Sequence, residues 1–182
     1  YLFFMGVGEF SVIKDSYKGK EVSYYVEKEQ APYARGVFGN TPEMLKFFSE
    51  KLGVEYPWQK YAQIVGRDYV SGAMENTTAT LHGSAAYQNA RQLRDENKWE
   101  IVVAHELFHQ WFGDLVTAQS GKDHWLQEGF ATYYALLAER SVFGDDYFYY
   151  SLYQNAEQLK NASKNDSIPV LNEKASSLTF YQ

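Results

Sequence analysis

Residues 105–109 read His-Glu-Leu-Phe-His, and this short string constrains the fold more than any other feature of the chain. It lies in residues 98–116, where apolar residues recur with the period of an α-helix. Residues four apart lie one above the other on a helix, so His105 and His109 can reach one metal ion. Glu106 lies about 100° further round the helix, where it can bond a metal-bound water without being a ligand. The string therefore predicts a helix that carries a zinc site.

A catalytic zinc ion takes three protein ligands and keeps one position open. The chain has no Cys, so the third ligand must be another His or a carboxylate. Glu128 follows His109 after eighteen residues and falls on the next predicted helix, residues 123–142. We therefore expect one Zn²⁺ per chain, bound by His105, His109 and Glu128.

Strand patterns fill the first half of the chain and helical patterns the second. A turn at residues 18–20 separates two alternating segments, and Thr41 is expected to cap a helix that Gly53 ends. Strands before helices indicate an α+β fold and not an alternating α/β sheet. The expected strands are 2–14, 21–28, 61–70 and 77–81, and a last helix is expected from residue 145 or 146 to about 162.

The zinc string and its surroundings resemble a known family. His105, Glu106, His109 and then Glu128 within Trp-Leu-Gln-Glu-Gly-Phe-Ala look like the gluzincin signature, and residues 110–117 are similar to the M1 aminopeptidase pattern. The resemblance implies a thermolysin-like zincin catalytic domain with an N-terminal mixed sheet followed by helices. It also implies that residues 1–20 are the tail of an N-terminal β domain. Residues 21–182 would be a truncated catalytic domain whose parent has further N- and C-terminal domains.

Gly72-Ala73-Met74-Glu75-Asn76 resembles a second signature of this family. An aminopeptidase must recognise a free α-ammonium group beside the scissile bond, and a carboxylate facing the cleft gives a charge-assisted hydrogen bond to it. The resemblance assigns that role to Glu75. Gly72 and Ala73 have little side chain, so a substrate strand can approach their backbone closely.

The resemblance also implies how the reaction is catalysed. Zinc would lower the pKa of its bound water, and Glu106 would act as general base. A Tyr would stabilise the oxyanion, and Tyr181 is the expected residue. Other tyrosines compete for this role, although their helical spacing suggests packing: Tyr147, Tyr149, Tyr150 and Tyr153.

Composition narrows the partners further. The net charge of −6 argues against nucleic acid, and no apolar run approaches the length of about 18 residues that spans a bilayer. Composition does not identify the substrate; the family resemblance implies that the partners are peptides with a free N-terminus. The sequence does not choose between a cytoplasmic and a periplasmic or secreted location.

Three alternatives remain open at this stage. A zinc endopeptidase or an epoxide hydrolase can be built on the same ligands, and a relative without activity can keep the fold as a binding scaffold. The presence of Glu75 favours peptide N-termini, and the complete set of ligands and base weighs against the scaffold. The isolated segment is expected to bind zinc but to be weakly active or inactive.

Overall fold

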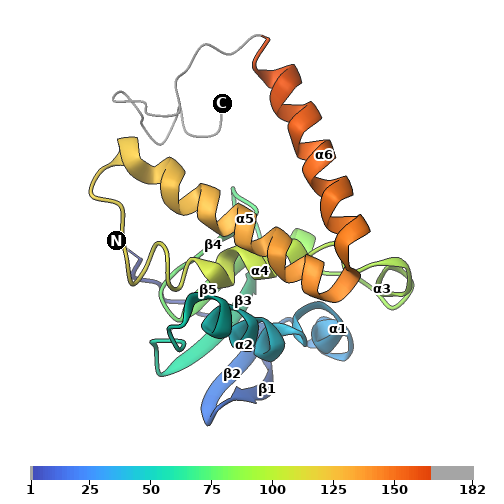
Figure 1. Cartoon of the computed structure of the whole chain (residues 1–182). Helices are drawn as coiled ribbons and strands as arrows, with labels where there is room; N and C mark the ends of the chain where they lie inside the picture. Colours follow the sequence, from blue (N-terminus) through green and yellow to red (C-terminus); the bar gives the residue numbers. More distant parts are fainter. Residues whose placement is uncertain (1, 165–182) are drawn as a thin grey trace.

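The computed structural model describes residues 2–164, which form a mixed β-sheet with helices packed beside it (Figure 1). The strands lie side by side in the order β1-β2-β3-β5-β4. Their bounds are β1 Ser11–Tyr17, β2 Lys20–Val26, β3 Lys60–Gly66, β4 Ala73–Met74 and β5 Ala79–Gly83. The α-helices are α1 Ala34–Phe38, α2 Thr41–Leu52, α3 Gln92–Asp95, α4 Glu100–Phe108, α5 His124–Phe143 and α6 Asp145–Ala162. Short 3-10 helices occupy Lys28–Tyr33, Ser84–Ala86 and Gly121–Asp123.

β1 and β2 form an antiparallel hairpin that closes where Tyr17 faces Lys20. Lys18 and Gly19 have φ values of 47° and 79°, which match the right-handed twist of a two-residue hairpin turn. The turn expected at residues 18–20 is present. The first strand begins only at Ser11, and not at residue 2, because the ladder with β2 starts there.

α2 ends where the sequence predicts but begins differently. Gly53 adopts φ 65° and ends the helix in the left-handed conformation that glycine tolerates. Thr41 is the first residue of α2, and Asn40 precedes it as the cap residue, so the expected capping role of Thr41 was wrong. The Thr41 hydroxyl instead donates to the carbonyl of Phe38 at 2.6 Å and accepts from Gln63 at 2.8 Å. It joins α1, α2 and β3 inside the core.

The last strands of the sheet form its edge. β3 pairs in parallel with β2 and with β5. The pairing with β2 is parallel because α1 and α2 carry the chain back across the sheet between these two strands. The two residues of β4 pair antiparallel with β5, Ala73 opposite His82 and Met74 opposite Leu81. Among the described residues β4 has no second neighbour, so its outer backbone groups are free to pair with another strand.

α4 lies between the sheet and α5, and Figure 1 shows α5 lying across it, with α6 projecting away after the turn at Gly144. Phe108 joins the layers, since its ring centre lies 5.3 Å from that of Phe48 on α2 and 4.4 Å from that of Tyr134 on α5. Ala131 and Ala135 are fully buried, and their small side chains let α5 approach closely. The helix pair that carries the predicted zinc ligands is thus anchored in the core.

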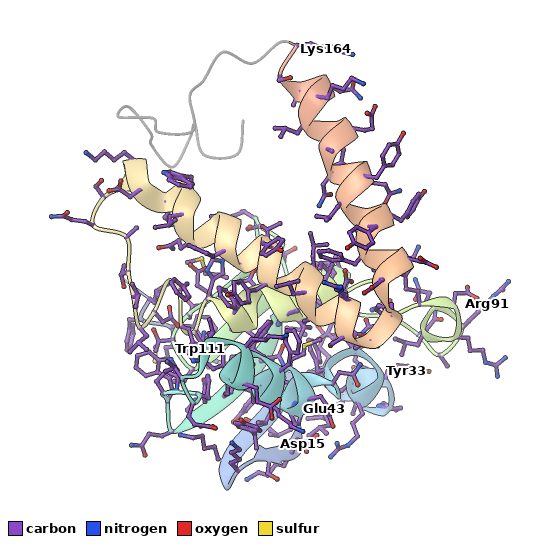
Figure 2. The ribbon with its side chains drawn as sticks, viewed as in Figure 1. Asp15, Tyr33, Glu43, Arg91, Trp111 and Lys164 are labelled. Carbon is purple, nitrogen blue, oxygen red and sulfur yellow. The ribbon has the colours of Figure 1, made fainter. Side chains whose placement is uncertain are left out.

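The zinc helix is shorter than the apolar pattern suggested. α4 ends at Phe108, and His109 is its C-cap residue, whereas a helix to about residue 116 was expected. Trp111 follows the helix and packs in the core, and this packing explains the apolar residue at this position. Its Nε1 donates to the carbonyl of Val54 at 3.1 Å. Figure 2 shows Trp111 among the side chains of the body, and Lys164 at the far end of α6.

The mixed sheet followed by helices confirms the expected α+β class. Within residues 2–164, every helix is too short or too polar to cross a membrane.

Candidate metal centre and cleft

Three side chains from two helices meet at one point. His105 lies in the last turn of α4, His109 caps that helix, and Glu128 lies in the second turn of α5. Nε2 of His105 is 3.0 Å from Nε2 of His109 and 3.2 Å from Oε2 of Glu128. Nε2 of His109 is 3.5 Å from the same oxygen. The set has the composition and the spacing of a metal-binding group.

The spacing can be compared with that of a real zinc ion. Ligands at about 2.0–2.2 Å in a tetrahedron lie about 3.3–3.6 Å from one another. The three distances in the structure, 3.0, 3.2 and 3.5 Å, come close to this range without rearrangement of the side chains. Two imidazole nitrogens that face each other are also well suited to share a cation. The residues present therefore fit zinc.

The turn after α4 holds the ring of His109 in place. Its Nδ1 lies 2.9 Å from the carbonyl oxygen of Phe112, so Nδ1 carries the proton and donates it. Nε2 is then left with a lone pair for a metal. Gly113 makes this turn possible: its φ is 142°, and a Cβ there would lie 3.2 Å from Nδ1 of His109. On the other ligand, Thr132 lies 3.5 Å from Nδ1 of His105.

The three side chains of the metal-binding group interact electrostatically. Burial alone would raise the pKa of Glu128, but its hydrogen bonds with His105 and His109 hold that pKa far below its ordinary value. Burial lowers the pKa of His109, whereas the bond to Glu128 and the charge of Glu75 more than offset this and bring it to about 9. Anionic groups thus favour a cation at this position.

Glu106 lies beside the three ligands and is not one of them. It is 7% exposed, and within residues 2–164 its Oε2 is buried with no hydrogen-bond partner. The pKa of Glu106 is raised to about 8: burial is the largest cause, His109 acts to lower the pKa, and the carboxylates of Glu75 and Glu128 act to raise it. A carboxyl group with a pKa near neutrality can both accept and release a proton.

Residues 71–75 form the wall opposite α4 in a cleft of about 310 Å³. This cleft contains Glu75, Glu106 and all three side chains of the metal-binding group, together with Ser71, Gly72, Ala73, Met74, Ile101 and Val102. Glu75 is only 5% exposed. A Cβ at Gly72 would meet no atom within 4 Å, so the backbone there borders open space. Asn76 is buried and does not line the cleft.

Other residues singled out from the sequence lie elsewhere. Tyr181 is outside the described residues. Tyr149, Tyr150 and Tyr153 lie on α6 with exposures of 60–63%, and they do not line the cleft. Asp114 lines a separate cavity of about 430 Å³, and burial raises its pKa to about 7, with a further contribution from Glu75.

Gln110 begins the stretch 110–117 that resembles the M1 pattern, but the sequence alone suggested no role for its side chain. Its side chain is fully buried and bonds to the backbone at both Glu75 and Thr78. A buried amide directly after a zinc ligand is an available signal, because such a group must find hydrogen-bond partners.

Comparison with known proteins decides the family. The model of the peptidase family M1 domain matches residues 37–179. The chain belongs to peptidase family M1. Glutamyl aminopeptidase of Sus scrofa is 36% identical over 146 residues, which cover 75% of this chain and 15% of that protein. Aminopeptidase M1 of Arabidopsis thaliana is 37% identical over 152 residues, covering 79% and 17%.

A third relative shows similar agreement. Probable aminopeptidase 2 of Sulfurisphaera tokodaii is 35% identical over 137 residues, which cover 73% of this chain and 17% of that protein. The M1 chain described here therefore spans only 15–17% of the length of these curated relatives.

Proposed function

We propose that this M1 segment is part of the catalytic domain of a zinc aminopeptidase, which removes the N-terminal residue of peptides. One Zn²⁺ per chain would be held by His105, His109 and Glu128. One observation carries the proposal: three ligand atoms separated by 3.0–3.5 Å share a single cleft with Glu106 and Glu75. When bound, zinc supplies a Lewis acid that lowers the pKa of a coordinated water and polarises the scissile carbonyl.

Glu106 moves the protons. Its Oε2 takes a proton from the attacking water and passes it to the nitrogen of the leaving amine. The burial of Glu106 supports this role, because a carboxylate shielded from water binds a proton more readily than an exposed one. Tyr181, which lies outside the described residues, is proposed to donate a hydrogen bond to the oxyanion.

Glu75 holds the free amine. A buried carboxylate gives a strong charge-assisted hydrogen bond to an ammonium group, so peptides without a free N-terminus lose this contact. β4, Ala73–Met74, lies directly before Glu75 and presents an unpaired edge within residues 2–164. A substrate in extended conformation can pair with this edge, and the small residues Gly72 and Ala73 let it approach.

Residues 1–20 are proposed to be the tail of a preceding β domain and residues 21–182 a portion of the catalytic domain. The small share of the relatives that the chain spans supports a longer parent protein. We expect the segment alone to bind zinc and to have little activity.

The test is hydrolysis of leucine p-nitroanilide by the whole protein that carries this segment. We expect one zinc ion per chain, loss of activity on chelation and recovery on adding Zn²⁺. Glu106→Gln should retain zinc and lower kcat by about 10²- to 10⁴-fold. A Glu106→Gln variant with wild-type activity would refute the role of the base.

A second substrate separates the alternatives. N-acetyl-leucine p-nitroanilide lacks the amine, and an aminopeptidase should cleave it very slowly. An endopeptidase would cleave internal bonds of a blocked peptide. An epoxide hydrolase would leave both anilides intact but open an epoxide, and a binding scaffold would turn over none of these substrates.

A further inference from the structure

Gln110 makes the hydrogen bonds that join the end of the metal-binding helix to the segment carrying Glu75. Its Nε2 donates to the carbonyl oxygen of Glu75 at 3.1 Å, and its Oε1 accepts from the backbone N–H of Thr78 at 2.9 Å. Both ends of one side-chain amide thus bond to one short stretch of backbone. The amide acts there as a peptide group of a neighbouring strand would.

This stretch of backbone has an unusual conformation that needs support. Thr78 has φ 63°, a left-handed conformation that β-branched residues rarely adopt. The N–H of Ala79 donates to the carbonyl of Asn76 at 2.8 Å, which closes a turn directly after Glu75. The bond to Gln110 satisfies the Thr78 N–H within this turn. Without the Gln110 amide, the buried carbonyl of Glu75 and the partly buried N–H of Thr78 would lose these hydrogen bonds.

Gln110 is itself held rigidly. It is fully buried, and its backbone carbonyl accepts from Nε1 of Trp58 at 2.9 Å. The Tyr56 hydroxyl lies 3.5 Å from Oε1 of Gln110, too far to contribute much to this support. Its neighbour in the chain is His109, which faces the other two side chains of the metal-binding group. A displacement of Gln110 therefore changes the position of Glu75 relative to the metal.

We propose that Gln110 is a positioning residue that sets the distance between Glu75 and the metal, and thereby makes recognition of the substrate amine possible. The proposal rests on the proposed aminopeptidase function. Gln110 touches no reacting atom, so it acts on amine recognition and not on the chemical step. Its loss should weaken binding of ligands that carry an α-amine and spare those that do not.

Two inhibitors isolate this effect. Leucine hydroxamate and its des-amino analogue, 4-methylpentanohydroxamate, present the same zinc-binding group, and only the first carries the amine. The ratio of their inhibition constants, measured on the whole protein, reports the amine contact alone. In the wild type we expect leucine hydroxamate to bind at least about tenfold more tightly, as a charge-assisted hydrogen bond provides.

Gln110→Met keeps the volume of the side chain and removes both hydrogen bonds. We expect it to retain zinc, to bind the des-amino inhibitor as the wild type does, and to lose most of the preference for the amine. Tyr56→Phe is the matched control, because it removes a neighbouring hydroxyl but leaves both backbone bonds. It should keep the wild-type ratio.

Gln110→Glu and hydrogen exchange cover the case in which Gln110→Met does not fold. Gln110→Glu keeps an acceptor for Thr78 but, when ionised, offers no proton to the carbonyl of Glu75. It should lose part of the preference. In the wild type, the Thr78 amide should exchange slowly.

An unchanged inhibitor ratio in Gln110→Met, or in Gln110→Glu if only that variant folds, would overturn the proposal, as would rapid exchange at Thr78. Glu75→Ala tells this failure from failure of the proposed function. If Glu75→Ala also keeps the wild-type ratio, the role of Glu75 is wrong; if it alone abolishes the preference, only the role of Gln110 is wrong.

Discussion

The carbonyl oxygen of Phe112 lies 2.9 Å from Nδ1 of His109 and fixes which nitrogen of that imidazole carries the proton. The contact exists because the chain leaves α4 at His109 and turns back through Gly113, where φ is 142°. A metal ligand oriented by the backbone does not depend on a second side chain for its tautomer. The turn after α4 is therefore part of the proposed metal centre.

Gly113→Ala should weaken zinc binding. A Cβ there would lie 3.1 Å from the carbonyl of His109 and 3.2 Å from its Nδ1, on a backbone conformation that alanine rarely adopts. We expect zinc affinity to fall by about 10- to 100-fold, as for loss of other contacts that orient ligands. Gly129→Ala is the control, since its Cβ would meet no atom within 4 Å. Competition with a chromogenic chelator measures both variants; equal affinities would contradict this account of the turn.

Substitutions of His105, Glu128 and His124 should show which of these side chains bind zinc. His105→Ala and Glu128→Gln each remove a proposed ligand, and we expect zinc content after dialysis to fall at least about tenfold. His124 lies on the same helix as Glu128, with its Nδ1 3.8 Å from Oε1. His124→Ala should keep a full complement of zinc, measured by atomic emission. Loss of zinc in His124→Ala would assign it to the ligand set.

Gly72→Val should obstruct the substrate without disturbing the fold. The added side chain would extend into open space beside β4, where we propose that the peptide pairs. Loss of about one backbone hydrogen bond, about 1 kcal/mol, should raise KM about fivefold or more. The melting temperature should stay within experimental error. Val70→Ala, at a fully exposed site, is the control and should leave KM unchanged. A wild-type KM in Gly72→Val would exclude the edge of β4 from substrate binding.

His82 predicts a dependence of stability on pH. It is fully buried, Trp99 donates to its Nδ1 at 3.1 Å, and its Nε2 lies 3.0 Å from Oε1 of Gln63. Burial lowers the pKa of His82 to about 3. Between that pH and about 6.5 the unfolded chain binds a proton that the folded chain does not, so stability falls as pH falls, by about 1.4 kcal/mol per unit.

The comparison with His82→Gln tests this dependence. The variant lacks the titrating group, so the melting temperature of the wild type should fall more steeply than that of the variant as pH is lowered from 7 to 5. The melting temperature of the wild type should exceed that of the variant by the largest amount above pH 6.5. Parallel curves would show that His82 becomes protonated without unfolding.

Local patterns predicted much of this molecule. The spacing of His105 and His109 is set by one helical turn, and Gly53 ends α2 for a reason that lies within a few residues. Features that depend on contacts between residues far apart in the sequence could not be predicted from local patterns. α4 ends at Phe108 because the residues after it turn into the core. From the sequence alone, the apolar residues that follow look like a continuation of the helix.

Gln110 illustrates the same limit at the site. Its two backbone partners lie 32 and 35 residues earlier, and no spacing rule connects them to the metal-binding string. The proximity of Glu128 to the two imidazoles likewise arises from the packing of α5 on α4, where buried alanines permit it. The sequence indicates which residues belong to the site, whereas the distances between them depend on the tertiary structure.

α5 also determines how this segment would behave in the laboratory. Ala131 and Ala135 of α5 are buried, whereas other large apolar residues of the helix are partly exposed. Trp125 and Leu126 are each 44% exposed, and Tyr133 is 47% exposed. A strip of this kind makes an isolated polypeptide adhere to itself and to vessel walls. Expression of residues 1–182 by themselves should therefore yield a more dispersed sample when Trp125 and Leu126 are replaced by polar residues.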